Sequence, residues 1–169
     1  MTLSLNNHEI IAVEGKNGSG KSTLIKYLLG ISQNLIAKGN YELIESLKIS
    51  YLPQEFVMYS GSLKDFAKKY HLSYEALLSN LKKMGFARAD FTTRIEKMSM
   101  GQQKRVALAK SLTEPANLYL WDEPANYLDV FNQDQLIKLL KSVKPTMLLI
   151  EHDPYFITSV ADQQIKLTN

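Results

Sequence analysis

The chain alternates between short apolar runs and longer stretches in which apolar residues return every third or fourth position. Apolar runs bounded by Gly, Pro or polar residues predict buried strands, whereas the longer spacing predicts helices with one buried side. We expect strands at 9–14, 41–44, 48–52, 118–121, 146–150 and 164–167. Helices are expected at 21–29, 62–70, 73–84, 101–112 and 132–143, with a shorter one after Pro154.

The predicted strands lie on both sides of a helical segment in the middle of the chain. Strands that alternate with helices are typical of a parallel sheet with helical crossovers. We therefore predict an α/β fold whose mainly parallel core is formed by residues 1–61 and 113–169, with a helical subdomain, residues 62–112, inserted into it. Residues 1–169 are expected to form a single domain.

Composition places the 169 residues among ordinary globular domains, since 45% of them are hydrophobic and 22% charged. No apolar run approaches the roughly 20 residues of a membrane-spanning helix, and the N-terminus is too polar for a secretory signal. The absence of cysteine excludes disulfides and thiolate metal sites. We expect a cytoplasmic protein without direct membrane insertion.

Charge is distributed unevenly along the chain. Residues 62–112 hold 11 Lys and Arg against 4 Asp and Glu, a local net charge of +7, although the whole chain carries only +3. A basic helical segment is either a well-solvated surface or a contact surface for an anionic partner such as nucleic acid. Charge alone favours the solvated surface.

The strongest chemical signal is the stretch 15–22, GKNGSGKS, between a predicted strand and a predicted helix. This pattern is that of a phosphate-binding loop, in which backbone N–H groups surround phosphate oxygens at a helix N-terminus. Lys21 is expected to reach the β- and γ-phosphates, and Ser22 to bind Mg²⁺. The predicted nucleotide-binding residues are Gly15, Asn17, Gly18, Ser19, Gly20, Lys21, Ser22 and Thr23.

A second part of such a site follows the apolar strand at 118–121. Asp122 and Glu123 stand at its C-terminal end, the edge at which parallel α/β sheets bind their ligands. Asp122 is predicted to bind Mg²⁺ and Glu123 to act as the base for an attacking water. On its own, a DE pair after a strand is weak evidence for a nucleotide site. Together with the phosphate loop at 15–22 it becomes strong evidence.

Between these two parts lies MSMGQQKR at 98–105, directly before a helix. It resembles the signature motif of ATP-binding-cassette (ABC) ATPases, whose usual form is LSGGQ. Three further positions match family motifs in the required order: Gln54 the glutamine loop, residues 126–129 (NYLD) the D-loop, and His152 the switch histidine. The chain is thereby identified as similar to an ABC cassette over most of its length.

This resemblance implies that ATP and Mg²⁺ are the cofactors and that two cassettes pair head to tail. Ser99, Gly101 and Gln102 would contact the ATP of the second cassette, and Asp129 belongs to the D-loop. Gln54 would act with Ser22 and Asp122 at the Mg²⁺. The resemblance thus makes Glu123, His152 and Gln54 the catalytic residues of an ATPase that is active only when paired.

Met100 departs from the family pattern, which has glycine at this position. A side chain here is expected to crowd the γ-phosphate of the partner's nucleotide. The nucleotide bound at residues 15–22 is not affected by this difference.

Within the family, WDEPANYLD together with EHD resembles the F class, and most of all the C-terminal cassette of F-class antibiotic-resistance proteins. That resemblance implies ATP-dependent binding to the bacterial ribosome and protection from antibiotics, with ribosomal RNA as a partner of the basic segment. Two alternatives stay open: the motor cassette of a transporter, and a nucleotide-binding module that serves assembly rather than turnover.

Recognition of the adenine base has no candidate residue. Cassettes usually stack adenine on an aromatic residue ahead of the phosphate loop, and none of the 14 residues before Gly15 is aromatic. We therefore expect a cassette that is truncated on its N-terminal side, with weak discrimination between ATP and GTP.

Overall fold

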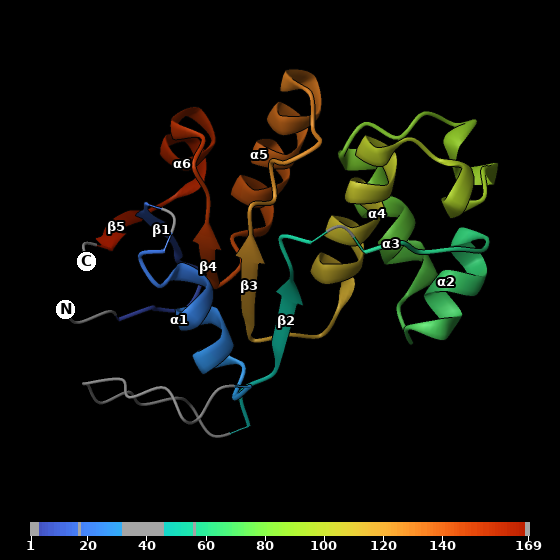
Figure 1. Ribbon diagram of the computed structural model, residues 1–169. Helices are drawn as coiled ribbons and strands as arrows, with labels where there is room; N and C mark the ends of the chain where they lie inside the picture. The colour runs from blue at the N-terminus through green and yellow to red at the C-terminus, as the bar shows by residue number, and fades with distance from the viewer. Residues whose placement is uncertain (1–3, 17, 32–45, 56, 168–169) are drawn as a thin grey trace.

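The fold is described from a computed structural model in which residues 4–16, 18–31, 46–55 and 57–167 are placed (Figure 1). Its five strands are β1 (Ile10–Gly15), β2 (Ile49–Leu52), β3 (Leu118–Asp122), β4 (Met147–Ile150) and β5 (Gln163–Leu167). Five of the predicted strands are thereby confirmed to within one or two residues. The strand expected at 41–44 and the loop residue Asn17 lie outside the described residues.

All five strands form one parallel sheet in the order β2-β3-β4-β1-β5. In its register Asp122 pairs with Ile150, and Ile150 pairs with Val13. The carboxyl ends of β3, β4 and β1 therefore lie side by side along one edge. This confirms the predicted parallel core and brings three distant parts of the chain together.

The helices are α1 (Lys21–Leu28), α2 (Leu63–Lys69), α3 (Tyr74–Lys83), α4 (Met100–Thr113), α5 (Val130–Val143) and α6 (Pro154–Val160), with short 3₁₀ turns at Asp90–Thr92 and Ile95–Lys97. Helices α4 and α5 begin one and two residues earlier than the apolar spacing predicts. Their first residues are exposed and do not fit an amphipathic pattern. The caps set the start instead, because Ser99 and Asp129 each accept a backbone N–H from the first turn.

The two faces of the sheet are covered by different helices, because side chains alternate along a strand. Ile11 and Val13 pack with Ile25 of α1 on one face. Ile10 and Ala12 belong to a larger core on the other face, which includes the buried sides of α4, α5 and α6. Of the helices in the described residues, α1, which follows the phosphate loop, is the one that packs on the side of Ile11 and Val13 (Figure 1).

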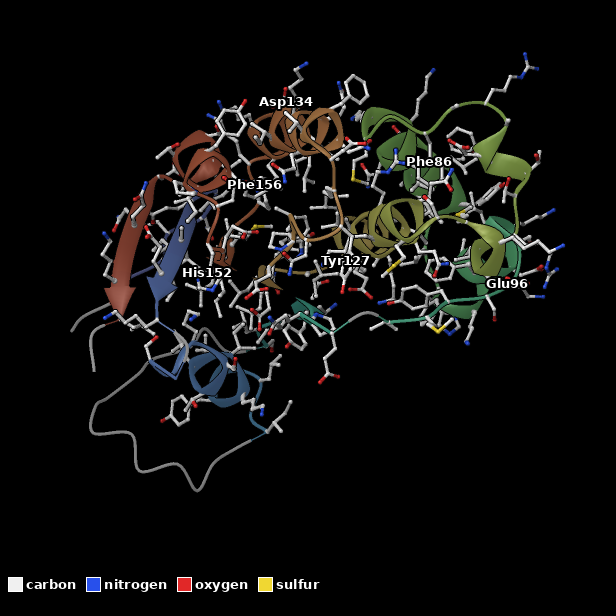
Figure 2. All side chains as sticks on the ribbon, turned by 45° about the horizontal axis from the view of Figure 1, so that its top comes forward. Phe86, Glu96, Tyr127, Asp134, His152 and Phe156 are labelled. Atoms are coloured by element: carbon white, nitrogen blue, oxygen red, sulfur yellow. The ribbon has the colours of Figure 1, made fainter. Side chains whose placement is uncertain are left out.

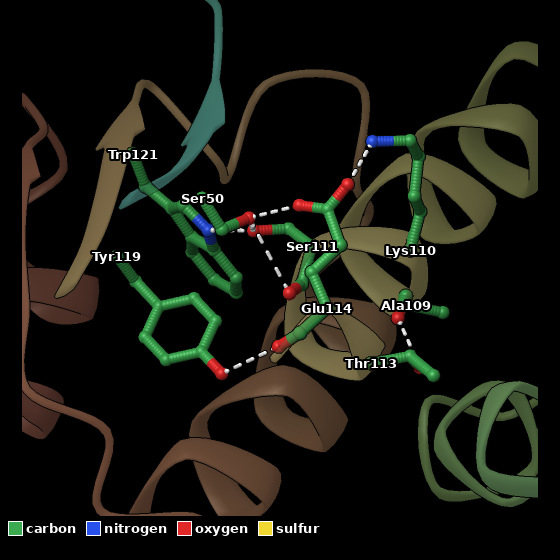
Figure 3. Close-up of polar contacts among 8 residues, drawn as sticks. All are labelled: Ser50, Ala109, Lys110, Ser111, Thr113, Glu114, Tyr119 and Trp121. Atoms are coloured by element: carbon green, nitrogen blue, oxygen red, sulfur yellow. Dashed lines mark hydrogen bonds and ion pairs between the residues drawn. The ribbon is translucent and has the colours of Figure 1, made fainter. Parts of the chain in front are cut away.

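Helix α4 joins the helical segment to the sheet. Its buried side chains contact α3, and its C-terminal end is tied to β2 and β3 by a buried polar network (Figure 3). There, Trp121 Nε1 donates to Ser111 Oγ at 2.8 Å, and the hydroxyls of Ser50 and Ser111 lie 2.7 Å apart. Glu114 accepts a hydrogen bond from Ser50 and pairs with Lys110. A shift of the C-terminal end of α4 would therefore break its hydrogen bonds to β2 and β3.

Among the residues that the structure describes, no helix has both the length and the apolar character needed to cross a membrane.

Candidate functional site

The phosphate loop follows β1 and folds back on itself before α1. Gly18 and Gly20 adopt positive φ angles of 84° and 93°, a region that favours glycine, and Gly20 is the N-cap of α1. A Cβ on Gly15 would collide with Ser19 and lie 3.1 Å from the carbonyl oxygen of Leu167, so a side chain there would require the loop to shift. These positions explain why the loop needs glycine at three of its predicted nucleotide-binding residues.

Lys21 is held inside this loop. Its side chain is buried, and Nζ donates to the carbonyl oxygens of Gly15 at 2.7 Å and Lys16 at 3.1 Å. Ser19 Oγ is buried and has no hydrogen-bond partner within the described residues. A buried ammonium and an unpaired hydroxyl in one loop suit an anion that would pair with both. Ser22 and Thr23 stand exposed in the first turn of α1.

Asp122 ends β3 as a buried carboxylate, 5% exposed. Burial, and next the charge of Glu123, raise the pKa of Asp122, whereas the positive charges of Lys21 and Lys104 act in the opposite direction. A buried carboxylate that faces the loop lysine is the kind of ligand that Mg²⁺ uses. Mg²⁺ is commonly bound by one or two carboxylates with phosphate and water completing the set, so these residues fit it.

Glu123 stands next to Asp122 in an unusual conformation. Its φ is 51°, in the left-handed region that non-glycine residues seldom adopt. Its N–H donates to Ile150 O at 2.8 Å, and its Oε2 accepts from Asn126 Nδ2 at 2.7 Å. Its Oε1 lies 3.4 Å from His152 Nε2. Glu123 and His152 were expected to act together, and the structure places their side chains in contact.

His152 follows β4 in a loop organised by Glu151. Glu151 is 3% exposed, and its Oε1 accepts from the N–H groups of His152 at 2.7 Å and Asp153 at 3.4 Å. Its other oxygen accepts from Ala125 N at 3.0 Å, in the turn after Glu123. This carboxylate therefore links the turn after β3 to the loop after β4. Sequence reasoning missed it, because the motif draws attention to the histidine beside it.

Lys104 was also missed. It lies on α4, is 4% exposed, and its Nζ donates to the carbonyl oxygen of Glu123 at 3.2 Å. Burial lowers the pKa of Lys104, and the charges of Glu151, Glu123 and Asp122 act in the opposite direction. In the sequence Lys104 is one of many lysines in a basic segment, and only the buried face of α4 distinguishes it.

The signature residues form the N-terminus of α4. Ser99 Oγ accepts from Gln102 N at 3.2 Å, and Gln102 Oε1 accepts from Ser99 N at 2.8 Å, a reciprocal cap. A Cβ on Gly101 would lie 3.0 Å from the carbonyl oxygen of Tyr127, so the signature packs against the turn at 126–129. Met100 is 51% exposed in the first turn.

Not every predicted residue joins the cluster around Glu123. Gln54 is exposed two residues after β2 and makes no hydrogen bond within the described part of the chain. Asp129 caps α5 by accepting from Asn132 N at 2.8 Å. Figure 2 shows Tyr127 beside α4 and His152 nearer to α1, so the signature and the phosphate loop approach this region from opposite sides.

Comparison with known proteins identifies a family, and the similar proteins include both a ribosome protection protein and an ATP-binding protein of a transporter. Residues 1–126 match the family described as ABC transporter. The ribosome protection protein VmlR of Bacillus subtilis is 29% identical over 98% of this chain. The zinc import ATP-binding protein ZnuC 1 of Hahella chejuensis is 33% identical over 99% of it. The chain spans 30% of the length of VmlR and 67% of that of ZnuC 1.

Solved structures show the same division. The archaeal ribosome recycling factor aABCE1, in complex with the stalk protein aP1, matches 96% of this chain and 32% of its own with a TM-score of 0.75 and 30% identity. A putative metal-chelate type ABC transporter in an inward-facing conformation matches 99% of this chain and 72% of its own, with a TM-score of 0.78 and 27% identity. The site, the fold and the family match agree, and this chain belongs to the ABC transporter family as an ATP-binding cassette.

Proposed function

We propose that this cassette binds ATP with Mg²⁺ and hydrolyses it to ADP and phosphate at the carboxyl edge of β1, β3 and β4. The observation that carries the proposal is the contact between Glu123 and His152, 3.4 Å apart, beside the buried Asp122 and close to the phosphate loop. A carboxylate held by a histidine at a phosphate site suits a base for an attacking water.

Each residue has a distinct role in this proposal. The loop amides and Lys21 bind the phosphates, while Ser22, Asp122 and Gln54 hold Mg²⁺. A cation held by these residues would supply positive charge to offset the charge that develops on the phosphate oxygens.

Glu123 takes the proton of the attacking water. Its two oxygens are oriented by Asn126 and by His152, and His152 also reaches the γ-phosphate. Because both partners fix the same carboxylate, the base is in place before the nucleotide binds.

A second cassette completes the site. Ser99, Gly101 and Gln102, together with the D-loop residue Asp129, would face the nucleotide held by the partner. The exposed side chain of Met100 would stand in that same interface.

For the whole protein we propose an F-class role: ATP-dependent binding to the ribosome, with antibiotic resistance by ribosome protection, in the cytoplasm. Support comes from the likeness to VmlR, whose name states ribosome protection, and from the basic segment. Lys82, Lys83 and Arg88 are exposed at and just beyond the end of α3, where they can contact phosphates of ribosomal RNA.

The test is co-sedimentation of the full protein with ribosomes, with and without ATP, over a range of salt concentrations. Reversal of Lys82, Lys83 and Arg88 to glutamate is expected to weaken association and to lower its salt dependence by roughly one unit of log–log slope per lost phosphate contact. The matched control reverses Lys138, Lys141 and Lys166, three exposed lysines outside the basic segment. Equal effects of the two triple variants would contradict the proposed contact.

The second candidate is the motor cassette of a transporter, favoured by the 33% identity to ZnuC 1. A transporter cassette would co-purify with a membrane protein and ignore ribosomes in the same assay. ATP-dependent sedimentation with ribosomes would exclude this alternative as the main role.

A further inference from the structure

Lys104 is a buried lysine on α4, the signature helix that Ser99 caps, and its ammonium contacts the main chain of Glu123. Lys104 lies about one helical turn after Ser99 and Gly101 on α4, and its ammonium donates to the main-chain oxygen of Glu123 at 3.2 Å. A buried lysine is costly unless its charge is compensated and its protons are bonded. Lys104 must therefore contribute something that an apolar residue at this position could not.

The charges of three carboxylates, Glu151, Glu123 and Asp122, act on Lys104, although none of the ion pairs in the described residues includes it. Glu151 is 3% exposed, and it accepts backbone N–H groups from Ala125 and His152. Of the three carboxylates that act on the ammonium of Lys104, Glu151 acts most strongly, ahead of Glu123 and Asp122.

Glu123 needs such support, because its backbone is in the left-handed region with φ 51°. A non-glycine residue keeps this conformation only when its surroundings hold it there. Its N–H is held by Ile150 of β4 and its carbonyl oxygen by Lys104 of α4. The orientation of the side chain toward His152 follows from this main-chain position.

We propose that Lys104 is a positioning residue for the hydrolysis reaction, because its ammonium fixes the main chain of Glu123 from α4. The start of α4 and the base of the same cassette then move together. When the signature binds the partner's nucleotide and shifts the start of α4, Lys104 passes that shift to the main chain of Glu123 in this chain. The inference rests on the proposed ATPase function and adds to it a residue that acts through another.

The experiment compares two double variants in the full protein, Lys104→Met/Glu151→Gln and Lys104→Gln/Glu151→Gln. Both are neutral at the two buried positions and similar in volume, but only the glutamine at position 104 retains an N–H donor for the carbonyl of Glu123. The methionine version is expected to lose about tenfold or more in kcat at unchanged KM for ATP, since a lost bond to a fixed group acts on the transition state. The glutamine version is expected to be at least about tenfold more active than the methionine version, since the acceptor that Glu151→Gln removes is lost in both.

Two further measurements separate positioning from stability. Amide hydrogen exchange at Glu123, whose N–H donates to Ile150 O, is expected to rise in the methionine version only, because this bond relies on the fixed main chain. Lys104→Met alone is expected to unfold at a lower temperature than Lys104→Met/Glu151→Gln, because it removes a positive charge that acts on the buried Glu151. Lys110→Met, on the same helix but paired with Glu114, is the control that should leave kcat unchanged.

Equal kcat values and equal exchange in the two double variants would overturn the positioning role. Glu123→Gln serves as the reference for the proposed function. If it abolishes hydrolysis while both double variants hydrolyse normally, only the role of Lys104 is wrong. If the unmodified protein releases no phosphate from ATP, the proposed function fails, and the positioning role fails with it.

Discussion

At the scale of single residues, the site depends on one strained position. A left-handed backbone costs a non-glycine residue about 1–2 kcal/mol, and Glu123 adopts it directly after the buried Asp122. The turn directs one carboxylate into the phosphate site and the next toward His152. Two adjacent acids on an extended strand would point to opposite faces of the sheet. The strain therefore brings both acids to one edge.

Replacement of this base tests its role directly. Glu123→Gln keeps the size of the side chain and an oxygen for Asn126 but removes the proton acceptor. We expect ATP binding to persist while hydrolysis slows by about 10²–10⁴-fold, the usual contribution of a general base. Single-turnover phosphate release and fluorescent-nucleotide binding measure the two effects, with the exposed Glu75→Gln as the control. Unchanged turnover would reject Glu123 as the base.

The signature serine has a structural role and a proposed functional role, and a matched variant separates them. Ser99 caps α4 and Ser73 caps α3 through the same type of hydrogen bond. Alanine at either position is expected to cost about 1 kcal/mol of stability. Only Ser99→Ala is expected to slow hydrolysis as well, since Ser73 caps a helix away from the signature. Thermal unfolding measures the stability of each variant, and phosphate release measures its rate of hydrolysis. Equal rates of hydrolysis in the two variants would show that Ser99 only caps the helix.

Motif reasoning selects candidate residues where the expected chemistry depends on residue type at a fixed spacing. Lys21, Asp122 and His152 are recognisable because phosphate and water require those groups in that order. Lys104 and Glu151 were not recognisable, because a buried charge looks the same in a sequence as a solvated one. Their partners come from α4 and from the loop after β4, and only tertiary packing brings them together.

At the scale of elements, α4 connects the helical segment to the sheet. Its middle carries Lys104, and its last turns carry Ser111, which accepts from Trp121 on β3 and lies 2.7 Å from Ser50 on β2. These groups are buried, so each hydrogen bond must be made within the protein. The polar network fixes one end of α4 while the signature occupies the other.

Loss of the central hydroxyl should therefore be costly. Ser111→Ala leaves the indole N–H of Trp121 buried without an acceptor, with an expected cost of about 1–3 kcal/mol. For a chain of this size each kcal/mol corresponds to roughly 2–4 °C in Tm. The control is Thr158→Ala, an exposed hydroxyl that bonds within its own helix, expected to change stability by less than about 0.5 kcal/mol. Similar Tm values for both variants would show that the network does not hold α4.

Element boundaries were predictable where a cap coincides with the apolar pattern, as at Ser62 and Ser73. They were less precise at α5, because Val130 and Phe131 are exposed and do not fit an amphipathic helix. The cap by Asp129 starts the helix there regardless of hydrophobic pattern. The hydrogen bond of the cap therefore starts α5 two residues before the position that the apolar periodicity predicts.

At the scale of the whole molecule, the sheet separates the two ends of the nucleotide machinery. The phosphate loop follows β1, while α4 packs on the edge strand β2, and β4 and β3 lie between them. The signature stands at the opposite end of α4 from its contact with β2, where Gly101 packs against the turn at 126–129, apart from the phosphate loop. The family resemblance already predicts that the two motifs serve different nucleotides, and the positions of β1 and of the start of α4 agree with it.

This separation predicts complementation between two defective copies. A Lys21→Ala chain keeps an intact signature, and a Ser99→Ala chain keeps an intact phosphate loop with its Glu123. Paired head to tail, they form one complete site, and random pairing should restore about a quarter of the normal rate of phosphate release. Lys21→Ala mixed with Glu123→Gln is the matched control. Because both residues serve the nucleotide of the same chain, this mixture has no complete site and should stay inactive. Recovery in both mixtures, or in neither, would contradict a site shared between two cassettes.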